Sequence, residues 1–194
     1  MHVINKSDIY KKASVGGIIT KSVFTITAIG SLLEVKGFDR LIRVAEMLKK
    51  DGISFCIQII GRGEKEAELK RLVHELNVEN EVHFLGFQAN PYPYLKESDI
   101  FISTSVSEGF SLVICEALVL GIPIVATNTA GALELLEGGE YGVITEQNDL
   151  SIYVALKKYI TDETLRTEYH KKSLLRANIF EVQSVMSRFY EVIQ

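Results

Sequence analysis

The chain has 194 residues, of which 47% are hydrophobic and 24% charged, and this composition predicts one soluble globular domain. The formal net charge of −4 and the scattered lysine pairs argue against a nucleic-acid-binding surface. The sequence has no run of about 18 apolar residues and no signal peptide, so we expect a cytoplasmic protein.

Strand and helix patterns alternate along the chain after an irregular segment of about twenty residues. Strands are expected at 24–29, 53–60, 81–85, 99–103, 122–126 and 141–144. Helices are expected at 38–50, 64–76, 91–96, 131–136, 163–177 and 182–192, with two more beginning near 109–112 and at 149. The alternation predicts a Rossmann-like, doubly wound parallel sheet of about six strands with helices on both faces.

Two carboxylates, Glu108 and Glu116, bracket the start of the expected helix near 109–112. That helix is apolar nearly all round, so Glu116 is at least partly desolvated and needs a hydrogen-bond donor from the protein or a ligand. We expect about 8 to 12 Å between the two carboxylates, which leaves room for a diphosphate. The helix N-terminus between them is an anion site, with Ser111 as a local cap.

A structural explanation of the pair is also open: Glu108 is then a loop carboxylate, and Glu116 reaches solvent through a gap in the packing. The flanking segments favour a ligand site. Residues 98–105 and 121–127 both read as strands, which makes the motif the turn and helix of a strand–helix–strand unit. In open α/β sheets, ligands bind at such turns.

The chain resembles the donor-binding half of glycosyltransferase family 4, a family with the GT-B fold. The resemblance is carried by the two glutamates with seven residues between them, by Gly121-Ile-Pro-Ile-Val-Ala-Thr after them, and by Lys36-Gly-Phe-Asp upstream. It covers nearly the whole chain. It implies a donor domain over residues 21–194 and an interdomain linker or tail over residues 1–20. It also implies that the N-terminal acceptor domain is absent.

The resemblance further implies a retaining sugar transfer from a nucleoside-diphosphate sugar, with UDP-sugars favoured, to an acceptor hydroxyl in polysaccharide or glycolipid biosynthesis. No cofactor or metal is expected. Lys36 and Glu108 are the implied catalytic residues: Lys36 neutralises the leaving diphosphate, and Glu108 positions the donor sugar. The implied donor-binding residues are Gly30, Ser31, Phe110, Ser111, Leu112 and Glu116. Of these, Glu116 bonds the ribose hydroxyls.

One position departs from the family pattern, because Ser31 stands where the family usually has arginine. Arginine would give a charged, bidentate contact to the diphosphate, whereas serine offers one hydroxyl. Arg62 or a cation from the absent half is a candidate replacement. The departure leaves open an alternative function, a catalytically silent nucleotide-sugar-binding module. A nucleotide-sugar epimerase is a third possibility.

Other chemistry-bearing residues receive simpler interpretations. Gly61-Arg-Gly follows a strand, but Glu66 stands where a dinucleotide fingerprint needs its third glycine, so we expect a strand-to-helix turn. The two cysteines lack metal-ligand spacing and are expected in the core. The histidines have no assigned chemistry. Thr127 and Thr129 are expected to bond either sugar hydroxyls or local backbone, and Gly131-Ala-Leu-Glu134 either to line the sugar pocket or to cap a short helix. Any membrane contact is expected only through the absent half.

Overall fold

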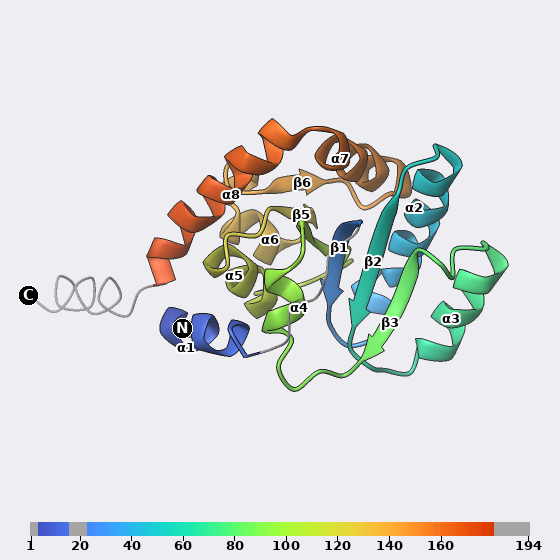
Figure 1. Cartoon of the computed structure of the whole chain (residues 1–194), viewed down its shortest axis with the longest axis horizontal. Coiled ribbons are helices and arrows are strands. Elements are labelled where there is room, and N and C mark those ends of the chain that lie inside the picture. The colour runs from blue at the N-terminus through green and yellow to red at the C-terminus, as the bar shows by residue number, and fades with distance from the viewer. Residues whose placement is uncertain (1–3, 16–22, 181–194) are drawn as a thin grey trace, which may run out of the picture.

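The computed structural model describes residues 4–15 and 23–180, and its centre is a parallel β-sheet (Figure 1). The strands are β1 (Phe24–Ile29), β2 (Phe55–Ile60), β3 (Val82–Gly86), β4 (Ile100–Ser103), β5 (Ile124–Thr127) and β6 (Val143–Thr145). Their spatial order is β3-β2-β1-β4-β5-β6, and every neighbouring pair is parallel. The predicted six-stranded parallel sheet is confirmed.

Helices pack on both faces of this sheet, as predicted. One layer contains α2 (Phe38–Lys50), α3 (Glu66–Glu75) and α7 (Asp149–Thr161). The other contains α1 (Lys6–Ala13), α4 (Tyr92–Lys96), α5 (Leu112–Val119) and α6 (Ala130–Leu135). Helix α8 (Glu163–Ala177) contacts both α7 and α5 and so connects the two layers. Short 3₁₀ turns occupy Glu34–Lys36, Glu137–Gly139 and Asn178–Phe180.

Strand β4 shows why the sheet needs cover on both faces. Ile100 and Ile102 lie in the hydrophobic cluster under α2 and α7, whereas Phe101 between them lies in the cluster under α5. All three side chains are at most 1% exposed. Alternate residues of a strand point to opposite faces, so a run of apolar residues buries both faces at once.

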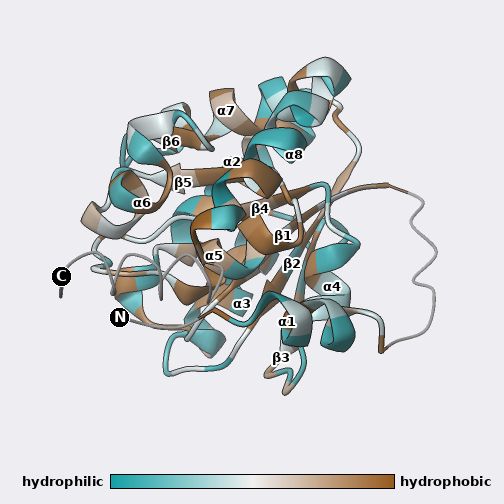
Figure 2. Cartoon of the chain, turned by 90° about the vertical axis from the view of Figure 1, so that its left-hand side faces the viewer, coloured by the Kyte–Doolittle hydropathy of each residue, from teal (hydrophilic) through white to brown (hydrophobic). Residues whose placement is uncertain are grey.

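Helix α5 is the apolar helix that the sequence predicted, and Figure 2 shows it in brown near the middle of the molecule. Five of its side chains are buried, namely Ile114, Cys115, Ala117, Leu118 and Val119. The predicted cap at Ser111 is confirmed, because its hydroxyl accepts a hydrogen bond of 3.5 Å from the Ile114 amide. Helix α5 is therefore fixed by the packing of its buried side chains and by the cap at its N-terminus.

Several element boundaries differ from the prediction. The strand expected at 99–103 ends at Ser103 as predicted, but Thr104 and Ser105, which the wider stretch 98–105 also included, belong to the following loop. Strand β5 begins at Ile124 instead of Ile122, because Gly121 (φ 72°) and the residues after it complete the turn from α5. Such turns leave no sign in the apolar pattern, which runs through them unbroken.

Helix α1 was not predicted, since residues 1–20 were taken as an irregular linker or tail. Its first turn is capped by Asn5, whose side chain accepts a hydrogen bond of 3.1 Å from the Asp8 amide. Ile9 and Ala13 are buried against the cluster that contains α5. The helix predicted at 182–192 lies outside the described residues.

Candidate functional site

The candidate site lies where the strand order reverses direction. β1 and β4 are neighbours in the sheet, and the chain winds outward from them to β2 and β3 on one side and to β5 and β6 on the other. The loops that follow β1 and β4 carry Gly30 and Glu108, respectively. In open parallel sheets, this reversal point leaves a crevice at the carboxyl ends of the strands, where ligands bind.

Backbone contacts fix the two loops against each other. The Val106 amide donates a hydrogen bond of 2.8 Å to the Val35 carbonyl, and the Thr104 hydroxyl donates one of 2.9 Å to the Lys36 carbonyl. Gly37 completes the contact: its φ is 61°, and a Cβ there would lie 2.3 Å from the Thr104 carbonyl oxygen. Only glycine fits both the left-handed backbone and this close approach.

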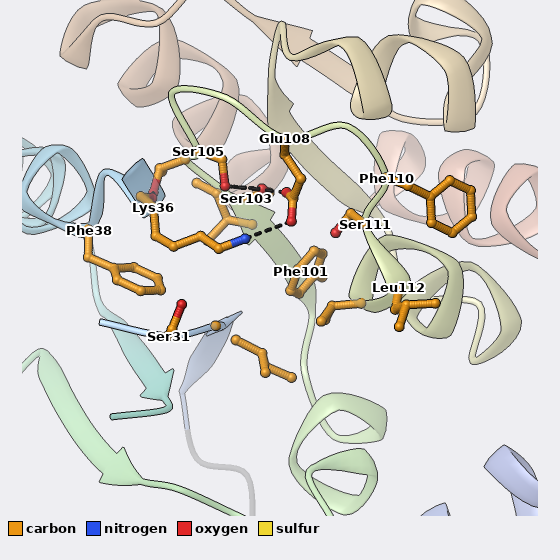
Figure 3. A pocket seen from close by; sticks show the side chains of 15 residues that line it. Ser31, Lys36, Phe38, Phe101, Ser103, Ser105, Glu108, Phe110, Ser111 and Leu112 are labelled. Carbon is orange, nitrogen blue, oxygen red and sulfur yellow. Dashed lines mark hydrogen bonds and ion pairs between the residues drawn. The ribbon is translucent and has the colours of Figure 1, made fainter. Parts of the chain in front are cut away.

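These contacts of residues 35–37 with Thr104 and Val106 form a clamp between the two loops, and the clamp places Lys36 next to Glu108. The Lys36 Nζ lies 2.6 Å from Glu108 Oε1, and the Ser105 hydroxyl lies 3.3 Å from Glu108 Oε2. Figure 3 shows the lysine stem crossing the pocket towards the carboxylate. A Cβ at Gly30 would lie 3.6 Å from Lys36 Cδ, so the stem passes in ordinary contact distance over the end of β1.

The loop of Glu108 is also supported from the side of β5. The Thr127 hydroxyl donates a hydrogen bond of 2.6 Å to the Ser105 carbonyl, and the Gly131 amide donates one of 2.9 Å to the Glu108 carbonyl. Thr129 caps α6 through the Ala132 amide. Thr129 thus bonds local backbone, one of its two predicted roles, whereas Thr127 bonds the backbone of a distant loop.

A pocket of about 290 Å³ opens at this point. Seven of the eight predicted site residues line it: Gly30, Ser31, Lys36, Glu108, Phe110, Ser111 and Leu112. Sequence reasoning missed other lining side chains, among them Phe38, Phe101, Ser103 and Ser105. Ser105 lies three residues before Glu108, but it was interpreted as part of the strand.

The N-terminus of α5 forms one wall of the pocket. Phe110 and Leu112 are 39% and 43% exposed, although both are apolar, and the capping residue Ser111 between them is buried. The first amides of an α-helix have no acceptor within the helix and carry a partial positive charge. This wall and the Lys36 ammonium together make the pocket favourable for an anion.

Glu116 lies outside the lining of this pocket, one turn further along α5. Its carboxylate accepts a hydrogen bond of 2.9 Å from the Tyr92 hydroxyl. Burial raises the pKa of Glu116, while the bond from Tyr92 and the charge of Lys12 act in the opposite direction. The same burial, together with the negative charge of Glu116, raises the pKa of Tyr92 to about 12. The protein donor that the sequence required for Glu116 is thus Tyr92.

The glycines after β2 serve a tight turn, as predicted. A Cβ at Gly61 would lie 1.8 Å from the Gly30 carbonyl oxygen, and one at Gly63 would lie 2.4 Å from that of Leu32. The guanidinium of Arg62 lies 4.7 Å from the centre of the Phe87 ring. Arg62 is therefore stacked on Phe87 and is absent from the lining of the pocket, which includes Ser31.

Within 4–15 and 23–180, no three His, Cys, Asp or Glu side chains are grouped in a way that could hold a metal ion. In the same part of the chain, no helix has the length and apolar character needed to cross a membrane.

The chain is similar in sequence to known glycosyltransferases. Residues 16–175 match the model of a family described as glycosyl transferases group 1. A relative from Campylobacter jejuni, an N-acetylgalactosamine-N,N'-diacetylbacillosaminyl-diphospho-undecaprenol 4-alpha-N-acetylgalactosaminyltransferase, is 37% identical over 80% of the chain and 42% of its own length. An uncharacterized glycosyltransferase from Haemophilus influenzae is 32% identical over 87% of the chain and 48% of its own length. The chain thus spans about half the length of these curated relatives.

Solved structures share the fold. A glycosyltransferase from Rickettsia africae superposes with a TM-score of 0.80 over 98% of the chain and 55% of its own length, at 19% identity. The HepE protein of Anabaena, solved in complex with UDP, superposes with a TM-score of 0.74 at 25% identity. That match covers 98% of the chain and 53% of HepE. The sheet order and the layers described above are those of one half of a GT-B protein.

Proposed function

The chain belongs to the group 1 glycosyl transferases, and on this basis we propose that it is the donor-binding half of a retaining, family 4 enzyme that uses a nucleoside-diphosphate sugar. One observation carries the proposal: Lys36 and Glu108, from different loops, meet at the reversal point of the sheet in front of the N-terminus of α5. A cation, a row of helix amides and a carboxylate match a diphosphate joined to a sugar.

We assign the diphosphate to Lys36 and to the first amides of α5. A leaving diphosphate gains negative charge as its bond to the sugar breaks, so groups already aimed at it stabilise the transition state more than the ground state. Lys36 is well placed for this because its backbone is fixed by Thr104 and its stem by contact with the end of β1. Ser31 offers a hydroxyl at the same edge of the pocket.

Glu108 then holds the donor sugar through its hydroxyls, and Glu116 holds the ribose. Both carboxylates accept hydrogen bonds from hydroxyl groups without reacting covalently. In a retaining transfer of this kind, the departing diphosphate assists the attacking acceptor hydroxyl on the same face of the sugar. The protein's contribution is orientation and electrostatic stabilisation, which is the contribution a pre-formed, clamped pocket can make.

We propose UDP-sugars as donors and polysaccharide or glycolipid assembly as the setting. Support comes from the UDP bound to HepE and from the C. jejuni relative, whose name describes transfer to a sugar that is linked to a lipid diphosphate. A capsular polysaccharide biosynthesis glycosyltransferase of Staphylococcus aureus is a further relative, at 28% identity. Because the chain spans about half of such proteins, we assign the acceptor site to a second, N-terminal domain.

Thermal melting with UDP, GDP, ADP, UDP-sugars and NAD tests the donor site. At ten times its Kd, a ligand stabilises the folded state by roughly 1.4 kcal/mol, which is a rise in Tm of about 3 to 6 °C for a chain of this size. We expect one nucleoside diphosphate to raise the Tm, and Glu116→Ala to abolish that rise. A chain that melts at the same temperature with every nucleotide would overturn the proposal.

A further inference from the structure

In the hydrogen bond between Tyr92 and Glu116, the identity of the donor matters for ligand binding. An ionised carboxylate only accepts hydrogen bonds, so the Tyr92 hydroxyl is the donor, and it binds Oε1 at 2.9 Å. In the described part of the chain, Oε1 is the only oxygen of Glu116 that receives a side-chain hydrogen bond. The contact therefore restrains Oε1 and leaves the second oxygen to accept bonds from a ligand.

Tyr92 is itself held by its surroundings. It lies in the first turn of the short helix α4, directly after Pro91, and its ring packs against the hydrophobic cluster that contains α5. The Lys12 ammonium lies 5.9 Å from the centre of the ring, and Lys12 also pairs with Asp8 at 2.8 Å. A cation over an aromatic face favours that placement of the ring.

Helix α1 connects the two helices that carry this pair. The Asn90 side chain, just before α4, donates a hydrogen bond of 2.9 Å to the Lys12 carbonyl at the end of α1. The Tyr10 hydroxyl donates one of 2.6 Å to the Val119 carbonyl at the end of α5. Through these two bonds α1 fixes α4 relative to α5, and hence Tyr92 relative to Glu116.

We propose that Tyr92 is a positioning residue of the nucleotide site: it orients Glu116 so that the free carboxylate oxygen receives the ribose hydroxyls, and α1 maintains that orientation. The inference rests on the proposed function, since it concerns the residue assigned to the ribose. It adds a group that does not touch the ligand and a helix that lies outside the pocket lining.

The test compares Tyr92→Phe with Tyr94→Phe, a matched control on the same helix. The hydroxyl of Tyr94 makes no hydrogen bond that involves the described residues. Calorimetry measures the Kd of each variant for UDP and for 2′,3′-dideoxy-UDP, which lacks both ribose hydroxyls. If UDP does not bind to the unaltered chain, ADP and GDP with their dideoxy forms take its place.

We expect Tyr92→Phe to weaken UDP binding by about threefold to tenfold, the range for one hydrogen bond. Binding of the dideoxy nucleotide should stay unchanged, so the preference for ribose falls. Tyr94→Phe should change neither Kd. In a Glu116→Ala background, which removes the acceptor, Tyr92→Phe should have no further effect on the ribose preference, because the tyrosine acts through the carboxylate.

Equal weakening of both nucleotides by Tyr92→Phe would assign the tyrosine a merely structural role and overturn the inference, as would no change in either Kd. If Tyr92→Phe does not fold, Tyr10→Phe against Tyr94→Phe decides: the first removes the bond from α1 to the end of α5 and must lower the ribose preference, and the second must not. Failure of the proposed function looks different, because then none of the three nucleoside diphosphates binds to the unaltered chain.

Discussion

Lys36 and Glu108, 72 positions apart in the sequence, form an ion pair of 2.6 Å across the carboxyl ends of β1 and β4. Both side chains are only partly exposed, at 22% and 15%. The cation assigned to the diphosphate is thus bonded to the carboxylate assigned to the sugar. A diphosphate must compete with Glu108 for Lys36.

Removing the charge of Glu108 should therefore spare or improve the binding of a free nucleotide. For Glu108→Gln we expect UDP affinity that is unchanged or up to about fivefold higher, since a partly exposed ion pair contributes about 1 kcal/mol or less. The advantage of a UDP-sugar over UDP should be lost. Lys36→Met, as the reference, should weaken both ligands. Calorimetry measures the Kd of each variant for UDP and for the UDP-sugar. Weaker UDP binding by Glu108→Gln would contradict the idea that Glu108 and the diphosphate compete for Lys36.

Introducing arginine at position 31 should strengthen the binding of an anion in the pocket. Ser31 is exposed at the edge of the pocket, and a guanidinium there would add a hydrogen bond between charged groups to the diphosphate. We expect Ser31→Arg to tighten UDP binding by about tenfold, which is the weaker end of the range for charged hydrogen bonds. Ser31→Met supplies length without charge and should give no gain. The gain should shrink as salt is added.

The close approach at Gly131 predicts a sensitive position. A Cβ there would lie 2.7 Å from the Gly109 carbonyl oxygen and 3.0 Å from the Phe110 amide nitrogen. Both belong to the backbone, so the whole loop must shift. Gly131→Ala should cost about 1 to 3 kcal/mol of unfolding free energy and displace Glu108. Gly109→Ala is the control, because its Cβ meets no atom within 4 Å. Denaturant melts of both variants compare them directly.

The environment of Glu116 predicts a pH-dependent gain in stability on its removal. Burial raises the pKa of Glu116 above its value in the unfolded chain, so the folded state disfavours the ionised form. This destabilisation is absent below the unfolded pKa and complete above the raised one. Glu116→Gln should therefore melt higher than the unaltered chain at pH 7 to 8, with a difference that vanishes near pH 4. Glu134→Gln, an exposed position, provides the comparison. A difference that grows as the pH falls would contradict the assignment.

Tyr159 offers a stabilising substitution away from the site. Its side chain is fully buried in the cluster under α2 and α7, and its hydroxyl has no hydrogen-bond partner within the described residues. The ring packs edge-on against Tyr169 with centroids 5.6 Å apart, a contact that phenylalanine keeps. Tyr159→Phe should gain about 1 kcal/mol and raise the Tm by about 2 to 4 °C. A lower Tm would show that the hydroxyl is satisfied.

Much of the fold was predictable because its signals are local. The alternation of apolar strands with amphipathic helices gave all six strands, and the apolar run after Ser111 gave the buried helix with its cap. The family resemblance placed Glu108 and Lys36 in one site, and each of them follows a strand that ends at the same edge of the parallel sheet.

The rest depends on contacts between distant segments. Helix α1 has eight residues, too few to be stable alone, and only Ile9 and Ala13 of them are buried. Its burial against α4 and α5 is what makes it a helix. The bond from Tyr92 to Glu116 joins α4 to α5 across 24 positions, and no spacing rule relates the two residues. Asn5 before Asp8 was a usable capping signal for α1, and it was not taken.

The clamp between Gly37 and Thr104 has a consequence for the time course of binding. Lys36 and Glu108 lie on loops that are hydrogen-bonded to each other and to β5. Neither loop therefore has to rearrange when a nucleotide binds. We expect association with the chain in a single kinetic phase whose rate rises linearly with nucleotide concentration, with affinity differences between variants expressed mainly in dissociation. Stopped-flow mixing would show a rate that levels off at high concentration if the loops had to rearrange first.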